Sequence, residues 1–226
     1  MSLLLQITQQ ALPIDMPTEE KLNLLSLMTK GGYFMIPLVI LSIIAVYIFI
    51  ERYQKIRKAR KEDPAFMNQL RDHVMSGNIH SAQDLCKNTD HPLARMLSKG
   101  VLRIGRPLKD IEASVENVGK IEIGKLETNM SALATIAGAA PMIGFLGTVT
   151  GMIKAFYNMS KAGNNIDPAL LSGGIYEAMV TTAAGLIVGI MAYVGYNILV
   201  AMIEKVIYTL ETRSIEFIDL LQEPSK

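Results

Sequence analysis

Residues 137–153 read AGAAPMIGFLGTVTGMI, and residues 174–186 read GIYEAMVTTAAGL. The first stretch lies within the uncharged run Thr128–Ile153, and the second leads into the uncharged run Ala178–Ile203. Each run has about 26 residues, which is long enough to cross a bilayer as a tilted helix. Tyr33–Ile50 is a third uncharged run, with about the 18 residues of a minimal spanning helix. The sequence therefore predicts an all-α integral membrane protein with three transmembrane helices.

The composition fits membrane spans better than a soluble core. Half of the 226 residues are hydrophobic, yet aromatic residues make up only 6% and tryptophan is absent. The apolar residues are mainly aliphatic residues, alanine and methionine, and they cluster along the chain. A buried soluble helix could explain one such run, but three runs in a chain with so few aromatic residues disfavour that alternative.

Basic residues flank the first predicted span unequally. Only Lys21 and Lys30 precede it, whereas a basic cluster follows it directly, formed by Arg52, Lys55, Arg57, Lys58, Arg60 and Lys61. Because cytoplasmic flanks are enriched in Lys and Arg, the N-terminus is expected outside and the C-terminus in the cytoplasm. We interpret the basic cluster as a topology determinant that also contacts lipid headgroups; binding of a cytoplasmic partner is the alternative.

The three spans divide the chain into seven expected segments. These are an outer N-terminal amphipathic segment, transmembrane helix 1, a cytoplasmic helical domain, transmembrane helix 2, a short outer connection with the start of helix 3, transmembrane helix 3 and a cytoplasmic C-terminal helix. Their bounds are 1–30, 31–51, 52–127, 128–155, 156–176, 177–203 and 204–226. Within the first segment, the leucine pattern of residues 18–29 predicts an amphipathic helix on the outer interface.

Proline and glycine mark the helices of the cytoplasmic domain. Asp63 and Pro64 have the pattern of an N-cap and first helical position, and Gly77 ends that helix. Pro92 and Pro107 mark two further helix starts. The apolar periodicity after Pro107 predicts one unbroken helix that runs from the cytoplasm through the second span.

Small residues recur along the second and third spans. They are Gly138, Gly144, Gly147 and Gly151, together with Pro141, in the second span, and Gly185 and Gly189 in the third. In lipid, small residues four positions apart let two helix backbones approach closely. These helices should therefore pack against other helices, either within the subunit or in neighbouring copies.

Polar side chains mark the same two helices. Thr148 lies in the second span and Thr181 and Thr182 in the third, although an isolated threonine usually bonds back to its own helix. Glu177 is more informative, because an ionised carboxylate at membrane depth costs about 2.5 to 3.5 kcal/mol or more. It must therefore lie near an interface, line a wet cavity or become neutral.

The depth of Glu177 depends on where the third helix begins. Asp167 and Pro168 have the pattern of a helix start, which places Glu177 about 15 Å along the helix. If the helix protrudes outward, Glu177 is interfacial; if it starts near the outer surface, Glu177 is deep, and we favour the deep position. A deep carboxylate with hydroxyls from two closely packed helices would form a polar seam that protons could use.

The two quoted stretches resemble the ExbB/TolQ/MotA proton-channel family, most of all its ExbB/TolQ branch. Residues 141–151 are similar to the second-span motif, in which a proline precedes a glycine-rich pattern containing Gly-Thr-Val. Residues 177–186 are similar to the third-span motif Glu-Ala-Leu-x-x-Thr-x-x-Gly-Leu, with Met179 at the leucine position. The layout of spans and loops also resembles that of the branch, whereas four-span MotA-type stators fit less well.

The resemblance implies a homopentamer whose second and third spans line a pore around the helices of an ExbD/TolR-like single-span partner. It implies that Thr148 and Thr182 are pore-lining hydroxyls, that Glu177 forms a polar ring near them, and that Thr181 is an additional hydroxyl. The partner's membrane aspartate would bind the transported protons, and a TonB- or TolA-like protein would carry the motion outward. The implied location is the bacterial inner membrane, and no cofactor is implied.

Several functions remain open within and beyond this resemblance. The main hypothesis is an ExbB-type motor subunit for outer-membrane import, and the alternative is a TolQ-like subunit of a Tol-Pal-type motor. A nonconducting membrane scaffold would use the same ring only to anchor partner helices. A transporter for a small solute would usually need more spans or an inverted repeat.

The other motifs predict neither an enzyme, nor a metal centre, nor a nucleic-acid-binding protein. His73, His80, Asp84, Cys86 and His91 lie close in sequence, but their spacing matches no standard zinc pattern. No glycine-rich phosphate loop, nucleophile elbow or carboxylate pair occurs in the sequence. The net charge of +1 provides no basic field that would attract nucleic acid.

Overall fold

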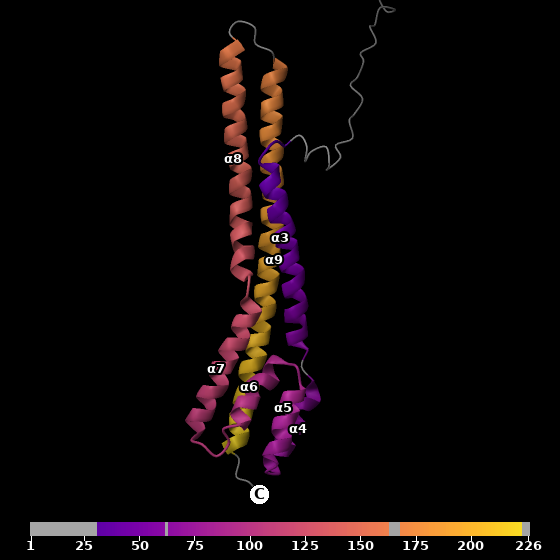
Figure 1. Cartoon of the computed structure of the whole chain (residues 1–226), viewed down its shortest axis with the longest axis vertical. Coiled ribbons are helices and arrows are strands. Elements are labelled where there is room, and N and C mark those ends of the chain that lie inside the picture. The colour runs from indigo at the N-terminus through magenta and orange to yellow at the C-terminus, as the bar shows by residue number, and fades with distance from the viewer. Residues whose placement is uncertain (1–30, 62, 163–167, 223–226) are drawn as a thin grey trace, which may run out of the picture.

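The computed structural model describes residues 31–61, 63–162 and 168–222, and its regular elements are all α-helices. They are α3 (Met35–Arg60), α4 (Pro64–Met75), α5 (Ile79–Asn88), α6 (Pro92–Val101), α7 (Leu108–Glu127), α8 (Met130–Ala162) and α9 (Pro168–Gln222). The molecule is elongated, with α3, α8 and α9 along its long axis and the short helices gathered around the C-terminal part of α9 (Figure 1). The predicted amphipathic helix at 18–29 lies outside the described residues.

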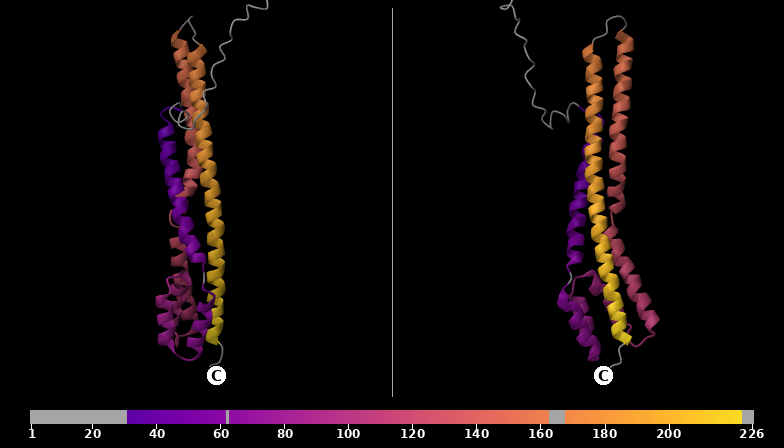
Figure 2. Two further views of the ribbon diagram at one scale, coloured as in Figure 1. Left: turned by 90° about the vertical axis from the view of Figure 1, so that its right-hand side faces the viewer. Right: turned by 180° about the vertical axis from the view of Figure 1, so that it is seen from behind.

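Three stretches are long and apolar enough to cross a membrane. They are Met35–Arg60, Leu108–Lys161 and Leu171–Gln222. The second and third contain the uncharged runs Thr128–Ile153 and Ala178–Ile203, and the first contains all but the first two residues of Tyr33–Ile50. The prediction of an all-helical protein with three candidate spans is confirmed. Helices α8 and α9 share the most extensive contact in the molecule, and α3 packs against α9 (Figure 2).

The short helices begin and end where the sequence patterns place them. Asp63 Oδ1 accepts a hydrogen bond from Ala65 N at 2.9 Å, with Pro64 at the first helical position of α4. After α4 the chain turns at Gly77, which has a left-handed φ of +72°. His91 Nδ1 accepts from the backbone of Leu93 at 3.2 Å and caps α6. The predicted helix start at Asp167 lies partly outside the described residues, and α9 begins at Pro168.

The predicted unbroken helix through the second span is wrong. Helix α7 ends at Glu127 and α8 begins at Met130, and between them Asn129 has a left-handed φ of +63°. Asparagine is one of the few non-glycine residues that adopt this conformation readily. The second span is therefore joined to α7 by a bend, whereas α9 runs from end to end without a break (Figure 2).

Helices α6 and α7 form a small core around the C-terminal end of α9. Phe217 of α9 is completely buried and so are Leu97 of α6 and Val115 of α7. Gly100 leaves room for this contact, since a Cβ atom there would lie 2.6 Å from the ring of Phe217. One hydrophobic core thus continues from the spans into the shorter helices.

Candidate functional site

The glycines of α8 and α9 bring the two helix backbones into direct contact. A Cβ atom on Gly144 would lie 3.1 Å from the Cα atom of Gly185, and one on Gly185 would lie 2.7 Å from the carbonyl oxygen of Ala140. One on Gly189 would lie 2.5 Å from the ring of Pro141. Because most of these neighbours are backbone atoms, a larger residue would force the helices apart.

Two further glycines of α8 accommodate side chains of α9. The space beside Gly147 is filled by Thr181, and the space beside Gly151 by Ala178, to whose Cβ atom a Cβ on Gly151 would lie 3.0 Å. Gly138 differs from the rest of the set, since a Cβ atom there would meet nothing within 4 Å. Of the six α8–α9 packing glycines, the structure thus buries four inside the protomer, leaves Gly151 half-buried and leaves Gly138 on an open face.

Thr148 and Thr182 form a hydroxyl pair between α8 and α9. Their Oγ1 atoms are hydrogen-bonded to each other, and both are near the carbonyl oxygen of Gly144. Thr182 donates to that oxygen at 3.0 Å and Thr148 at 3.3 Å. Both side chains are half-buried, so they are accessible from one side. The pair offers adjacent donors and acceptors of the kind that orient water.

Thr181 lies elsewhere, although it is the neighbour of Thr182 in the sequence. It is only 2% exposed, and its hydroxyl is within hydrogen-bond distance of the carbonyl oxygens of Gly31 and Glu177, at 2.8 Å each. It therefore joins α9 to the turn before α3, and the structure does not bring it to the hydroxyl pair. Its place in the proton path stays a prediction.

Glu177 is half-buried and lies beside Gly32, immediately before the first span. Nine residues of α9, 168–176, extend beyond it, about 13 Å at 1.5 Å per residue. Helices α8 and α9 also extend well beyond the N-terminal end of α3 (Figure 1). Since the uncharged run of α3 is only long enough for a minimal span, this arrangement favours the interfacial position of Glu177 over the deep one.

The predicted basic cluster does not behave as one exposed group. Arg52 is only 3% exposed, and its Nη1 donates to the carbonyl oxygen of Lys125 at 3.1 Å, beyond the reach of a headgroup. Its inclusion among the headgroup contacts is therefore corrected: it ties α3 to the end of α7. The other members are exposed, and two of them form ion pairs, Lys55 with Glu51 and Lys58 with Asp90.

A network of ion pairs that sequence reasoning missed connects α3, α6 and α7. Arg95 pairs with Asp90 at 2.8 Å and with the buried Glu122 at 2.7 Å, and Lys125 also pairs with Glu122. The hydrogen bond from Lys58, with help from Arg95, lowers the pKa of the Asp90 carboxyl. Lys58 and Asp90 are 32 residues apart and Arg95 and Glu122 are 27 apart, so no local pattern could have predicted these two pairs.

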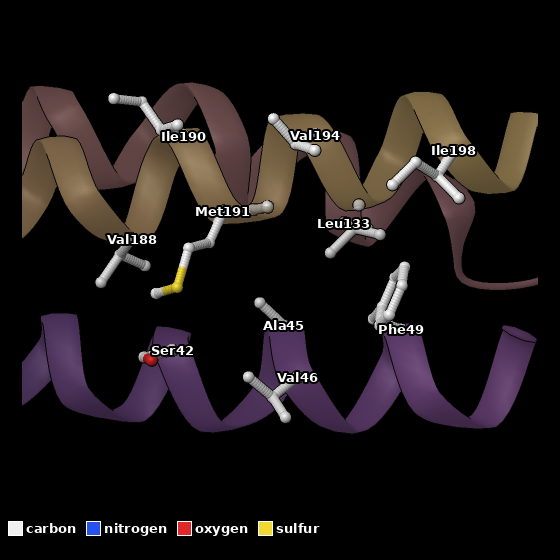
Figure 3. A pocket seen from close by; sticks show the side chains of 12 residues that line it. Ser42, Ala45, Val46, Phe49, Leu133, Val188, Ile190, Met191, Val194 and Ile198 are labelled. Atoms are coloured by element: carbon white, nitrogen blue, oxygen red, sulfur yellow. The ribbon is translucent and has the colours of Figure 1, made fainter.

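An apolar hollow lies between α3 and α9 and contains none of these polar groups. Its walls are formed by one face of α3, by Leu133 and by residues 188–198 of α9 (Figure 3). Ser42 alone among the lining residues has a polar side chain. The hollow therefore offers no path for an ion.

The potential metal ligands of residues 73–91 are distributed over α4, α5 and the N-cap of α6. Among the residues that the structure describes, no group of three His, Cys, Asp or Glu side chains could hold a metal ion. His91 Nε2 lies 2.9 Å from the carbonyl oxygen of Ala59. Cys86 is buried, and burial raises its pKa to about 11, which disfavours a reactive thiolate.

Comparison with known proteins gives the site its context. Residues 88–212, which include α8 and most of α9, match the MotA/TolQ/ExbB proton channel family. The chain belongs to this family. It is 31% identical over 183 residues to the biopolymer transport protein ExbB of Neisseria meningitidis, with 74% of this chain and 80% of that protein covered.

Two other relatives cover similar shares of the chain. A Synechocystis protein described as ExbB-like is 28% identical over 183 residues, covering 80% of this chain and 72% of its own length. The Tol-Pal system protein TolQ of Pseudomonas aeruginosa is 26% identical over 194 residues, covering 81% and 84%. Membership of a proton channel family and three apolar helices identify a multi-pass inner-membrane protein rather than a classical enzyme.

Proposed function

We propose that the chain is the proton-conducting stator subunit of an ExbB–ExbD-type motor, which converts the proton-motive force into work on a TonB-like partner. This proposal depends most on the hydrogen-bonded hydroxyls of Thr148 and Thr182. They join α8 to α9 within the region that matches the family. In this proposal, five copies surround the helices of an ExbD/TolR-like protein, and the half-buried side of the pair faces that partner.

The open face of α8 supports assembly into a ring. Large apolar side chains are exposed along it, including Met142, Phe145 and Ile153, which are 73%, 66% and 62% exposed. Ala134 and Gly138 continue this face toward the cytoplasm, where small residues permit close approach of another helix. A neighbouring copy that packs here would complete the wall of the pore.

The polar groups of α9 define an order along the proposed path. Thr182 is five residues below Glu177, about 7.5 Å along the helix. Glu177 would attract protons at the outer rim, and the hydroxyl pair would order the water that leads to an acidic group of the partner. Each proton that crosses the field releases about 2.3 kcal/mol per 100 mV. Cyclic protonation of that acidic group would bias the motion of the partner helices.

The orientation and the exposed basic residues complete the proposal. In this proposal the N-terminus lies outside and the C-terminus lies in the cytoplasm, because the exposed residues Arg57, Lys58, Arg60 and Lys61 follow the first span. These basic side chains would contact lipid headgroups. A TolQ-like role with a TolR- and TolA-like pair is the second candidate, supported by the similarity to TolQ.

Proton flux into liposomes that contain the chain and its single-span partner tests the proposal. Thr148→Val and Thr182→Val should each abolish flux while the complex still assembles, because valine keeps the volume and removes the hydroxyl. Thr150→Val is the matched control, since Thr150 bonds only to carbonyls of its own helix, of Leu146 and Gly147.

Two outcomes of this experiment would reject the proposal. Wild-type flux in both valine variants would remove the hydroxyl pair from the path. A complex that is sealed to protons although its partner's acidic groups are intact would instead support a nonconducting scaffold.

A further inference from the structure

A glycine pair forms the turn that leads into the first span. Gly32 has a left-handed φ of +67°, and its carbonyl oxygen accepts a hydrogen bond from Met35 N at 3.2 Å. Gly31 is enclosed: a Cβ atom there would overlap the side chain of Met35 and lie 3.3 Å from that of Val180. The turn is thus pressed against α9 at the level of Glu177.

Thr181 fixes the turn to the same part of α9. Its buried hydroxyl lies 2.8 Å from the carbonyl oxygen of Gly31 and 2.8 Å from that of Glu177. Because a buried hydroxyl without a partner is costly, this contact holds the turn and the backbone of Glu177 in one position. The two sides of the contact are 150 residues apart in the sequence.

The carboxylate of Glu177 occupies the space that a side chain on Gly32 would need. A Cβ atom built on Gly32 would overlap Oε1 of Glu177 and lie 2.7 Å from its Cδ. The overlapped group is the end of a flexible side chain and not backbone. Alanine at position 32 would therefore displace the carboxylate while the helices stay in place.

We propose that the Gly31–Gly32 turn is a positioning element for Glu177, holding its carboxylate at one place on the outer rim. The effect on proton flux rests on the proposed function of Glu177, whereas the effect on carboxylate position does not. The competing explanation is that Gly32 is glycine only because its φ is positive. Gly77 distinguishes these two explanations, because it also has a positive φ, of +72°, but a Cβ atom there would meet nothing within 4 Å.

Chemical labelling measures the position of the carboxylate without reference to function. The full-length protein is treated in detergent with a hydrophobic carbodiimide, and the modification of Glu177 is followed by mass spectrometry of its peptide. Gly32→Ala should change the labelling rate severalfold, whereas Gly77→Ala should leave it at the wild-type rate. Both variants should lower the unfolding temperature by similar amounts, because both strain a left-handed residue.

A second pair of variants tests the same contact from the side of α9. Thr181→Val removes the hydroxyl that holds Gly31 and should also change the labelling rate of Glu177, whereas Thr181→Ser should restore it. If Gly32→Ala did not fold, this pair would decide the question. Labelling at the wild-type rate in Thr181→Val, or in a folded Gly32→Ala, would overturn the proposal, as would an equal change in Gly77→Ala.

Proton flux with the single-span partner in liposomes then links position to function. Gly32→Ala should lower flux on the order of tenfold, since misplacement of a functional group by about 1 Å can cost up to 10²-fold. The double variant Gly32→Ala/Glu177→Asp, with a shorter carboxylate that avoids the new Cβ, should recover part of this loss. A changed labelling rate with unchanged flux would support the positioning of the Glu177 carboxylate by the turn. It would reject a role of Glu177 in proton flux.

Discussion

Neighbouring residues of α9 have different roles because a helix turns by about 100° per residue. Thr182 reaches Thr148 on α8, whereas Thr181 faces the turn before α3. Thr182 was predicted to line the pore because it occupies the threonine position of the family motif. The chemistry of threonine alone does not distinguish it from Thr181. Nothing local showed that Thr181 would be buried, because its partner Gly31 is in another part of the chain.

Glu177 and Glu204 flank the uncharged run of the third span, and they should differ in function. Glu177→Ala should lower proton flux strongly, because it removes a half-buried carboxylate from the outer rim of the proposed path. Glu204→Ala should have little effect, because Glu204 is exposed at the other end of the run. Proton flux into liposomes measures the effect of each variant. Equal, mild reductions of flux would indicate that Glu177 is an ordinary interface residue.

Arg52 should contribute to stability more than any other member of the basic cluster. Arg52→Ala leaves the carbonyl oxygen of Lys125 without this donor and should lower the free energy of unfolding by about 1–3 kcal/mol. Arg57→Ala, at an exposed position of the same helix, should change it by less than about 0.5 kcal/mol. Denaturant unfolding in detergent micelles measures both, and equal changes would contradict the structural role of Arg52.

At the scale of helices, α8 and α9 are in direct contact through their backbone atoms. In lipid, such packing replaces the hydrophobic effect as the source of helix association. Gly144 and Gly185 lie at the centre of the contact, and Pro141 fits against Gly189. The polar pair is held in place by this contact, because Thr182 donates to the carbonyl oxygen of Gly144.

Gly185→Ala should separate α8 from α9. The new Cβ would meet the backbone of Ala140 and Gly144, which cannot rotate away, and overpacking of this kind costs about 1–3 kcal/mol. Gly173→Ala in the same helix should be neutral or stabilising by up to about 1 kcal/mol, because nothing lies within 4 Å of its Cβ position. Unfolding in micelles followed by circular dichroism would reveal the difference; the same cost for both would argue against the close contact.

Helices with a strong local signal could be predicted from the sequence, and contacts between distant segments could not. The three spans follow from uncharged runs, and α4 and α6 follow from Asp63-Pro64 and Pro92. The break at Asn129 was missed because no proline or glycine marks it. The burial of Arg52 was also missed, since a basic residue after a span usually faces water or headgroups.

For the whole molecule, the ion pairs of α6 and α7 matter because they connect these helices to the first span. Lys58 of α3 pairs with Asp90, and Arg95 of α6 joins Asp90 to Glu122 of α7. Together with the contact from Arg52 to Lys125, they hold α6 and α7 against the end of α3. The first span and these two helices should therefore respond together to acid.

The contribution of Asp90 should depend on pH. Its pKa is lowered in the folded protein, mainly by the hydrogen bond from Lys58, so the stabilisation is present above the ordinary pKa of an aspartate and is lost as pH falls through the folded value. Asp90→Asn should lower the unfolding temperature slightly at pH 7, and this difference should disappear as the pH falls through the lowered pKa of Asp90. Asp84→Asn, at an exposed position of α5, is the control. A difference that persists at low pH would contradict the ionic origin.

The unbroken α9 has the geometry of a lever. Its 55 residues form a rod about 80 Å long, with Glu177 near one end and the buried Phe217 near the other. A tilt of about 3° around the middle of such a rod moves each tip by about 2 Å in opposite directions. The neighbouring segment formed by α7 and α8 bends at Asn129, and this bend would accommodate the displacement. In the proposed motor, movement of the inserted partner beside Glu177 would thus displace the tip of α9 around Phe217.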